Sequence, residues 1–125
     1  MLNVLALMQT QYRIDPARTY LAGHSMGGGG TWYMGARHAD LWAALASFAG
    51  AATVDSLPAL PRTPQFIVHG DADATVPLDR SRGMDAALTK LGVEHRYVEV
   101  PGGTHGSIVG PNLKGMFDFF DAHRR

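Results

Sequence analysis

A serine, an aspartate and a histidine are the residues best suited by type and setting to do chemistry in this chain. Ser25 stands at the centre of Gly23-His24-Ser25-Met26-Gly27. This is the spacing of a nucleophile elbow, a sharp turn between a strand and a helix that exposes the serine hydroxyl. Glycine suits the positions two before and two after the serine, because strand and helix nearly touch there. A glycine-rich loop that only turns the chain would show the same five residues, so the interpretation depends on their context.

A base and an acid for this serine can be chosen from the loops that follow. A serine hydroxyl is a weak nucleophile until a base, usually a histidine oriented by a carboxylate, takes its proton. We select His105 as the base, because it lies in the glycine-rich segment Gly102-Gly103-Thr104-His105-Gly106, which presents one side chain. We select Asp73 as the acid and interpret Asp71 as a turn former. The chain order Ser, Asp, His is that of α/β-hydrolases.

The other five histidines are weaker candidates for the base. We interpret His69, at the end of a buried strand, as a core residue with satisfied hydrogen bonds. His24 adjoins the nucleophile, so it either lines the substrate site or bonds to nearby backbone; Thr104 is the second expected substrate contact. No histidine and carboxylate share metal-ligand spacing on one helix, so we expect neither a metal nor another cofactor. Three histidines are expected at the surface: His38, His95 and His123.

Strands and helices alternate along the chain. Apolar, β-prone runs predict strands over residues 18–22, 41–50, 65–69 and 94–100, and apolar residues at helical spacing predict helices over 1–12, 25–38, 78–91 and from 111 onward. The first helix is expected to pack on the sheet, and a helical turn is expected within residues 54–60. The alternation predicts a parallel sheet with helices on both faces, in one domain of residues 1–125. The last helix is expected to bury one stripe of side chains: Leu113, Met116, Phe117 and Phe120.

This order of elements explains how the three chosen residues could meet. Ser25 follows the first predicted strand, Asp73 the third and His105 the fourth. The carboxyl ends of parallel strands share one edge of the sheet, and ligands bind outside that edge. We therefore expect the three side chains to converge there.

Composition excludes several classes of function. The chain of 125 residues has 11 Lys plus Arg and 11 Asp plus Glu, so no basic face for nucleic acid or an anionic membrane is expected. It has no cysteine, which excludes disulfides, thiolate metal sites and cysteine nucleophiles. No run approaches the roughly 18 apolar residues of a membrane span. The first 15 residues lack a basic region and a cleavage site, so a cytoplasmic location is expected.

Several segments resemble bacterial α/β-hydrolase esterases: Ile14-Asp15-Pro16, residues 18–28 (RTYLAGHSMGG) and Gly30-Thr31-Trp32. The nearest likeness is to the polyhydroxybutyrate depolymerase and feruloyl-esterase-like group and to the phospholipase/carboxylesterase group. Those families hold the acid in a segment like residues 69–77 (HGDADATVP) and the base in one like residues 102–106 (GGTHG). The resemblance therefore implies Asp73 and His105. It covers essentially the whole chain and implies a minimal α/β-hydrolase of about four parallel strands without a lid.

The resemblance is to the C-terminal half of that fold only. It implies that the backbone N–H of Met26, the residue after the nucleophile, is one donor to an oxyanion; the loop that supplies the second donor in the family lies in the other half. The strand before Ser25, central in the family, would here be an edge without a lysine or proline to protect it. We therefore expect a homodimer or higher homo-oligomer that covers the strand edge at Thr19 to Gly23.

Together these features predict a serine carboxylic ester hydrolase that forms an acyl-enzyme on short to medium acyl esters or aromatic esters. Two alternatives stay open. One is a serine peptidase of the prolyl-oligopeptidase type, which shares the triad. The other is a catalytically weak half-domain that serves as an assembly or binding module. Small-molecule esters are the expected partners, without nucleic acid or membrane.

Overall fold

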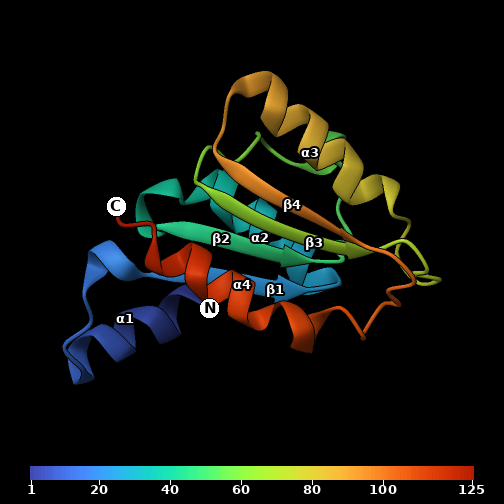
Figure 1. The fold of residues 1–125 in the computed structure, drawn as a ribbon. Helices are drawn as coiled ribbons and strands as arrows, with labels where there is room; N and C mark the ends of the chain where they lie inside the picture. Colours follow the sequence, from blue (N-terminus) through green and yellow to red (C-terminus); the bar gives the residue numbers. More distant parts are fainter.

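The computed structural model describes all residues 1–125 and contains one sheet of four parallel strands in the order β1-β2-β3-β4 (Figure 1). The predicted α/β class with about four parallel strands is confirmed. The strands are β1 (Tyr20–His24), β2 (Ala44–Phe48), β3 (Gln65–Gly70) and β4 (His95–Val100). The helices are α1 (Leu2–Gln11), α2 (Met26–Arg37), α3 (Asp79–Leu91) and α4 (Val109–Asp121). Three 3-10 turns complete the order: η1 (Pro16–Arg18), η2 (Ala39–Leu41) and η3 (Val54–Ser56).

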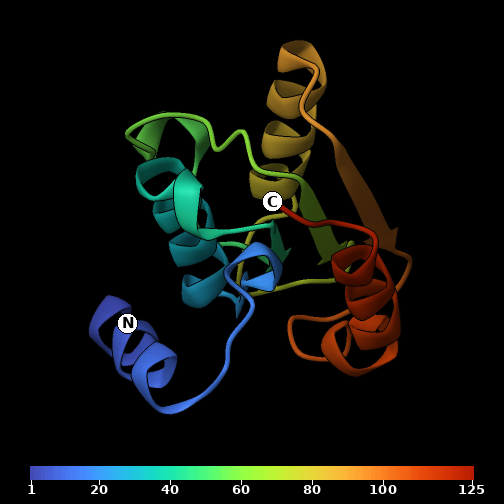
Figure 2. The same ribbon diagram turned by 90° about the vertical axis from the view of Figure 1, so that its left-hand side faces the viewer.

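The two central strands are covered on both faces, and this agrees with their sequences. Every residue of β2 and of β3 is buried, as expected for short apolar strands between helices. On one face α4 packs on Phe48, Phe66 and Val68, and on the other α2 and α3 pack on Ile67. Phe66 and Val68 point to one face and Ile67 to the other because side chains alternate along a strand. Figure 2 shows α4 and α2 on opposite sides of the strands.

The sheet has two edges, β1 and β4. The alternating sequence of β4 predicts an edge position, which is confirmed, since its residues are mostly half-buried. β1 begins two residues later than predicted, because the side chain of Asp15 caps a 3-10 turn over Pro16–Arg18. β2 is shorter than predicted at both ends: the turn η2 precedes it, and Ala49 just after it has a positive φ of 46°.

Two helices differ from the expectations. The first helix does not pack on the sheet: no residue of α1 is buried, and Val4 and Tyr12 are 60% and 64% exposed. It lies beyond the free edge of β1 (Figures 1 and 2). In α4, Phe120 is buried but Phe117 is 58% exposed, so the predicted stripe is only half right. The helix begins at Val109, earlier than expected, and its core face continues from the buried Ile108.

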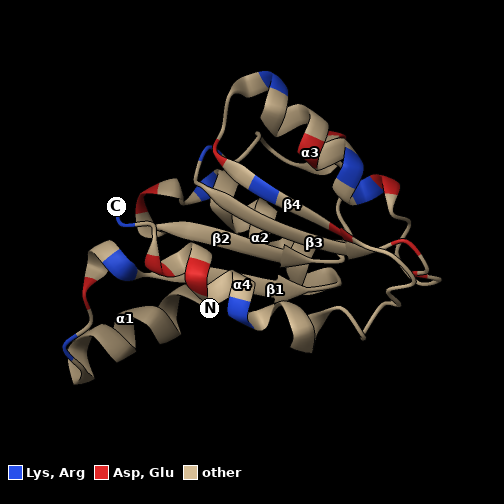
Figure 3. Cartoon of the chain, in the orientation of Figure 1, with Lys and Arg blue, Asp and Glu red and all other residues tan.

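Charged residues of both signs are interspersed along the chain (Figure 3). Two ion pairs connect segments that are far apart in the sequence. Arg18 binds Asp121 at 2.7 Å, and Arg124 binds Asp15 at 2.7 Å, which joins the segment before β1 to the end of α4. None of the helices combines the length and the apolar character needed to cross a membrane.

Candidate active site

Ser25 occupies a strained turn between β1 and α2. Its φ of 59° and ψ of −119° are rare for a residue with a side chain. The turn is fixed to the end of β2, because the Ser25 N–H donates to the carbonyl of Phe48 at 2.8 Å. The Ser25 carbonyl in turn accepts from the N–H groups of Gly29 (3.1 Å) and Ala51 (3.0 Å). A strained backbone persists where its surroundings fix it in this way.

The two glycines of the elbow are not equivalent. A Cβ atom added at Gly23 would lie 2.1 Å from the carbonyl oxygen of Gly27, where no side chain fits. A Cβ atom at Gly27 itself would meet nothing within 4 Å. The expectation that both positions need a small residue is therefore confirmed for Gly23 and wrong for Gly27. Gly23 approaches the backbone of Gly27, but a side chain at Gly27 would point into open space.

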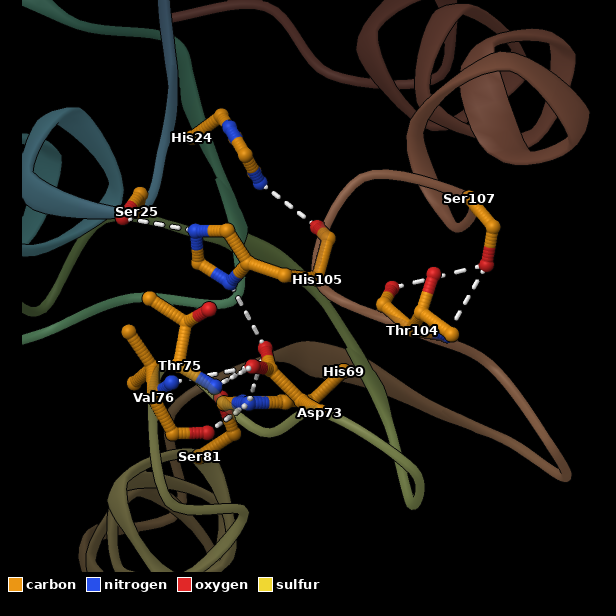
Figure 4. A network of polar contacts seen from close by, with 10 residues as sticks. All are labelled: His24, Ser25, His69, Asp73, Thr75, Val76, Ser81, Thr104, His105 and Ser107. Atoms are coloured by element: carbon orange, nitrogen blue, oxygen red, sulfur yellow. Dashed lines mark hydrogen bonds and ion pairs between the residues drawn. The ribbon is translucent and has the colours of Figure 1, made fainter.

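The structure brings Ser25, His105 and Asp73 together at the carboxyl ends of β1, β4 and β3 (Figure 4). His105 Nε2 lies 2.9 Å from Ser25 Oγ, and His105 Nδ1 lies 2.8 Å from Asp73 Oδ2. An ionised carboxylate only accepts hydrogen bonds, so Nδ1 carries the proton and the lone pair of Nε2 faces the serine hydroxyl. This tautomer is the one a general base needs.

The side chain of Asp73 is buried and held as an anion. Its Oδ1 accepts from the N–H groups of Thr75 (2.8 Å) and Val76 (2.9 Å). Burial raises the pKa of Asp73, but the hydrogen bonds from His105, Val76 and Thr75 outweigh it and lower that pKa from 3.8 to about 2. Near neutral pH the carboxylate is therefore ionised and fixed in orientation.

The loops that carry Asp73 and His105 are joined directly. Asp71 Oδ1 accepts from the N–H of Gly102 at 2.6 Å, so it bridges the two loops rather than forming the local turn expected from the sequence. The N–H of Ala72 donates to the carbonyl of Gly103 at 3.0 Å. A Cβ atom at Gly70 would overlap the backbone of Gly103. This close backbone contact fixes the spacing between Asp73 and His105.

The three remaining predicted site residues lie nearby. Met26 is the first residue of α2, so its N–H has no acceptor within the helix, and its side chain is 84% exposed. His24 Nε2 donates to the carbonyl of His105 at 2.7 Å, which is the backbone partner left open by the sequence. Thr104 is exposed and its N–H donates to Ser107 Oγ at 2.9 Å.

Several hydrogen-bond partners of the histidines could not be predicted from the sequence. His69 is fully buried, as predicted, but its partner Ser81, twelve residues later, was not foreseen. The expectation of surface histidines is wrong for His95 and His123, whose side chains are 11% and 13% exposed and bind Asp85 and Glu94. No group of three histidine, cysteine, aspartate or glutamate side chains is arranged to hold a metal ion.

An open apolar groove of about 500 Å³ begins at Met26, the residue after Ser25. One wall is the outer surface of α2, where Met26, Gly30 and Tyr33 line the groove. The other wall is the segment after β2, which contributes Ala52 and Leu57. A Cβ atom at Gly30 would meet nothing within 4 Å, so the glycine leaves the groove free.

Comparisons with known proteins agree with this geometry. The model of the PETase family, described as PET hydrolase-like, matches residues 2–119. Cutinase 2 of Thermobifida cellulosilytica is 33% identical over 80% of this chain and 37% of its own length, and cutinase cut1 of Thermobifida fusca is 33% identical over 80% of this chain and 31% of its own. The chain thus spans about a third of the length of these curated relatives.

Solved structures of esterases superpose on nearly the whole chain. A thermostable esterase matches 99% of the chain over 36% of its own, with a TM-score of 0.85 and 26% identity. Esterase PE8 matches 96% of the chain over 57% of its own, with a TM-score of 0.79 and 28% identity. A ferulic acid esterase from Anaeromyces mucronatus matches 96%, with a TM-score of 0.76 and 25% identity, over 50% of its own chain. The chain therefore belongs to the PET hydrolase-like family of α/β-hydrolases.

Proposed function

We propose that this protein is a carboxylic ester hydrolase in which Ser25 is the nucleophile, His105 the base and Asp73 the acid. The observation that carries the proposal is the continuous path of hydrogen bonds from Ser25 Oγ through His105 to Asp73 Oδ2, with distances of 2.9 and 2.8 Å. Family membership and the esterase neighbours support the same chemistry.

The reaction follows from the proton positions. Ser25 Oγ attacks the ester carbonyl carbon while its proton passes to His105 Nε2. The resulting imidazolium is stabilised by Asp73, and His105 then gives the proton to the leaving alcohol as the acyl-enzyme forms. Water next attacks the acyl carbon, again with His105 as the base, and the acid product leaves with Ser25 restored.

The oxyanion of each tetrahedral intermediate needs donors that are already in place. We assign the N–H of Met26 as one of them, because it stands at the start of α2 with no acceptor in the helix. The partial positive charge at the helix N-terminus acts in the same direction.

The groove beside Met26 supports esters with short to medium acyl chains or aromatic acyl groups as substrates. Its lining is apolar, and it is open to solvent. An apolar wall favours an uncharged hydrocarbon or aromatic group over a charged one. The cutinases and the ferulic acid esterase among the relatives support this substrate class.

We further propose a homodimer or higher homo-oligomer in which a partner copy covers the edge at Thr19 to Gly23. β1 is an edge strand, and Val4 and Leu7 of the neighbouring α1 are 60% and 51% exposed. An uncovered apolar helix beside an unprotected strand edge favours association. Analytical ultracentrifugation at micromolar concentration is expected to show the oligomer. An active, stable monomer would contradict this proposal.

The proposed chemistry is tested with Ser25→Ala. The variant is expected to lose hydrolysis of p-nitrophenyl butyrate and labelling by a fluorophosphonate probe while its circular dichroism spectrum stays unchanged. Turnover near that of the wild type would refute the role of Ser25. Faster cleavage of peptide than of ester substrates would favour the peptidase alternative, and a wild-type chain that the probe does not label would favour the binding module.

A further inference from the structure

His69 is a fully buried histidine that lies directly behind the proposed acid. It is the next-to-last residue of β3 and is 0% exposed. Its Nε2 faces two oxygen atoms, the carbonyl of Val76 at 3.0 Å and Asp73 Oδ2 at 3.2 Å (Figure 4). Its Nδ1 lies 2.7 Å from the hydroxyl of Ser81, which is buried on α3. The imidazole is thus enclosed between the loop that carries the acid and the helix that follows it.

The chemistry of the partners fixes the tautomer of the neutral His69 ring. A backbone carbonyl and a carboxylate can only accept, so Nε2 must carry the proton. The Nδ1 atom of a neutral imidazole with a proton on Nε2 is an acceptor, and the Ser81 hydroxyl therefore donates to it. In the other tautomer the proton would be on Nδ1, and the lone pair of Nε2 would face the oxygen atoms of Val76 and Asp73. The hydroxyl of Ser81 disfavours that tautomer by donating to Nδ1.

We infer that His69 and Ser81 act as a positioning pair for the acid of the proposed triad: Ser81 orients the His69 ring, and the ring holds the loop that carries Asp73. This inference rests on the proposed function. The Ser81 hydroxyl selects the tautomer of His69, and the Nε2–H of His69 then donates to the carbonyl of Val76, while Nε2 lies 3.2 Å from Asp73 Oδ2. This N–H group thereby fixes the backbone of the loop whose own N–H groups, at Thr75 and Val76, bind Asp73 Oδ1.

The pair also places a polar contact against Asp73. Oδ1 accepts from two backbone N–H groups and Oδ2 accepts from His105, while His69 Nε2 lies 3.2 Å from Oδ2. Three hydrogen bonds and the contact with His69 thus fix the orientation of the carboxylate. Without His69, Oδ2 would have His105 as its one remaining partner, and the angle at which it meets the imidazole would be less constrained.

Three variants separate positioning from packing. His69→Leu replaces the imidazole, and with it the N–H, by an apolar side chain of similar size. His69→Gln keeps an amide N–H that can reach Asp73. Ser81→Ala removes only the hydroxyl. A buried acceptor left without its donor, as the Val76 carbonyl would be in His69→Leu, corresponds to roughly a 10- to 100-fold effect, and one bond between neutral groups to about a 2- to 10-fold effect.

The measurement is kcat and KM for p-nitrophenyl butyrate at a temperature where each variant is folded by circular dichroism. We expect kcat to fall about 10- to 100-fold in His69→Leu and about 2- to 10-fold in Ser81→Ala, with KM unchanged because neither residue is exposed. We expect His69→Gln to recover most of the loss. The low-field proton resonance of the His105–Asp73 hydrogen bond is expected to shift in Ser81→Ala, which a purely structural role would not cause.

The outcomes distinguish this inference from the function on which it rests. A wild-type protein that neither hydrolyses the ester nor reacts with a fluorophosphonate overturns the proposed function, and the inference with it. A wild-type protein that reacts overturns the inference alone if Ser81→Ala keeps both the wild-type kcat and the wild-type proton resonance. Equal losses in His69→Gln and His69→Leu also overturn it, because packing would then explain the effect. If His69→Leu does not fold, Ser81→Ala still decides.

Discussion

Replacing Gly23 by alanine is the sharpest test of the geometry at the elbow. The added Cβ atom would stand 2.1 Å from the carbonyl oxygen of Gly27 and 2.8 Å from Thr31 Oγ1. Cβ atoms essentially never approach other heavy atoms closer than 3.0 Å, so β1 and α2 must separate by about 0.9 Å. The obstacle on the α2 side is backbone, which cannot rotate away as a side chain could.

The separation affects both stability and reactivity. Overpacking of this kind costs typically about 1–3 kcal/mol of the free energy of unfolding. Because the displaced segments lie on either side of Ser25, its hydroxyl moves relative to His105. A misplacement of about 1 Å can lower a rate by about 100-fold. We therefore expect Gly23→Ala to lower kcat/KM by about 100-fold and to lower the urea midpoint.

Gly27→Ala is the matched control, since it makes the same change at the symmetrical position of the same motif. The structure leaves its Cβ direction empty within 4 Å. Alanine is also favoured over glycine in a helix by about 0.5–1 kcal/mol. We expect this variant to be at least as stable as the wild type and to keep its activity. Urea titrations followed by circular dichroism and assays with p-nitrophenyl butyrate measure both effects. Wild-type behaviour of Gly23→Ala, or equal damage in the two variants, would refute the reasoning.

Two further predictions concern the core and the acid. Phe120→Ala is expected to cost about 3–5 kcal/mol of unfolding free energy, because the ring is buried and stacks on Tyr20 at a centroid distance of 4.6 Å. Phe117 is 58% exposed, so Phe117→Ala is expected to cost less than about 0.5 kcal/mol. Similar urea midpoints for the two variants would contradict the packing of α4. The pKa of Asp73 is lowered from 3.8 to about 2, so its ionised form stabilises the fold above pH of about 4 and this contribution is lost as the pH falls towards 2. The difference in urea midpoint between the wild type and Asp73→Asn is therefore expected to shrink over that range, and a constant difference would show that the carboxylate is not held as described.

The sequence predicts the order of strands and helices because that order follows from local patterns. The buried runs of β2 and β3, the amphipathic α3 and the glycine-bounded loops can each be recognised within a short window. The convergence of Ser25, Asp73 and His105 follows from one further rule, that parallel strands end at a common edge. These parts of the site need topology, not side-chain detail.

The parts that could not be predicted depend on where side chains point after packing. Phe117 and Phe120 both fit an apolar stripe, and the rotation of α4 about its axis decides which one is buried. Gly23 and Gly27 are symmetrical in the motif, but the Cβ direction faces the neighbouring helix at the first and open space at the second. A periodic pattern contains no information about either choice.

The contact between His69 and Ser81 shows the same limit at the site itself. The two residues belong to separate elements, and the loop over residues 71–78 must close around the imidazole before they meet. A buried histidine in a sequence indicates only that partners must exist, since an unpaired buried imidazole would be costly. The identity of these partners decides whether the histidine only packs in the core or also contacts a catalytic group. Here one partner is the carboxylate that binds His105, so the burial that made His69 look structural is what connects it to the proposed chemistry.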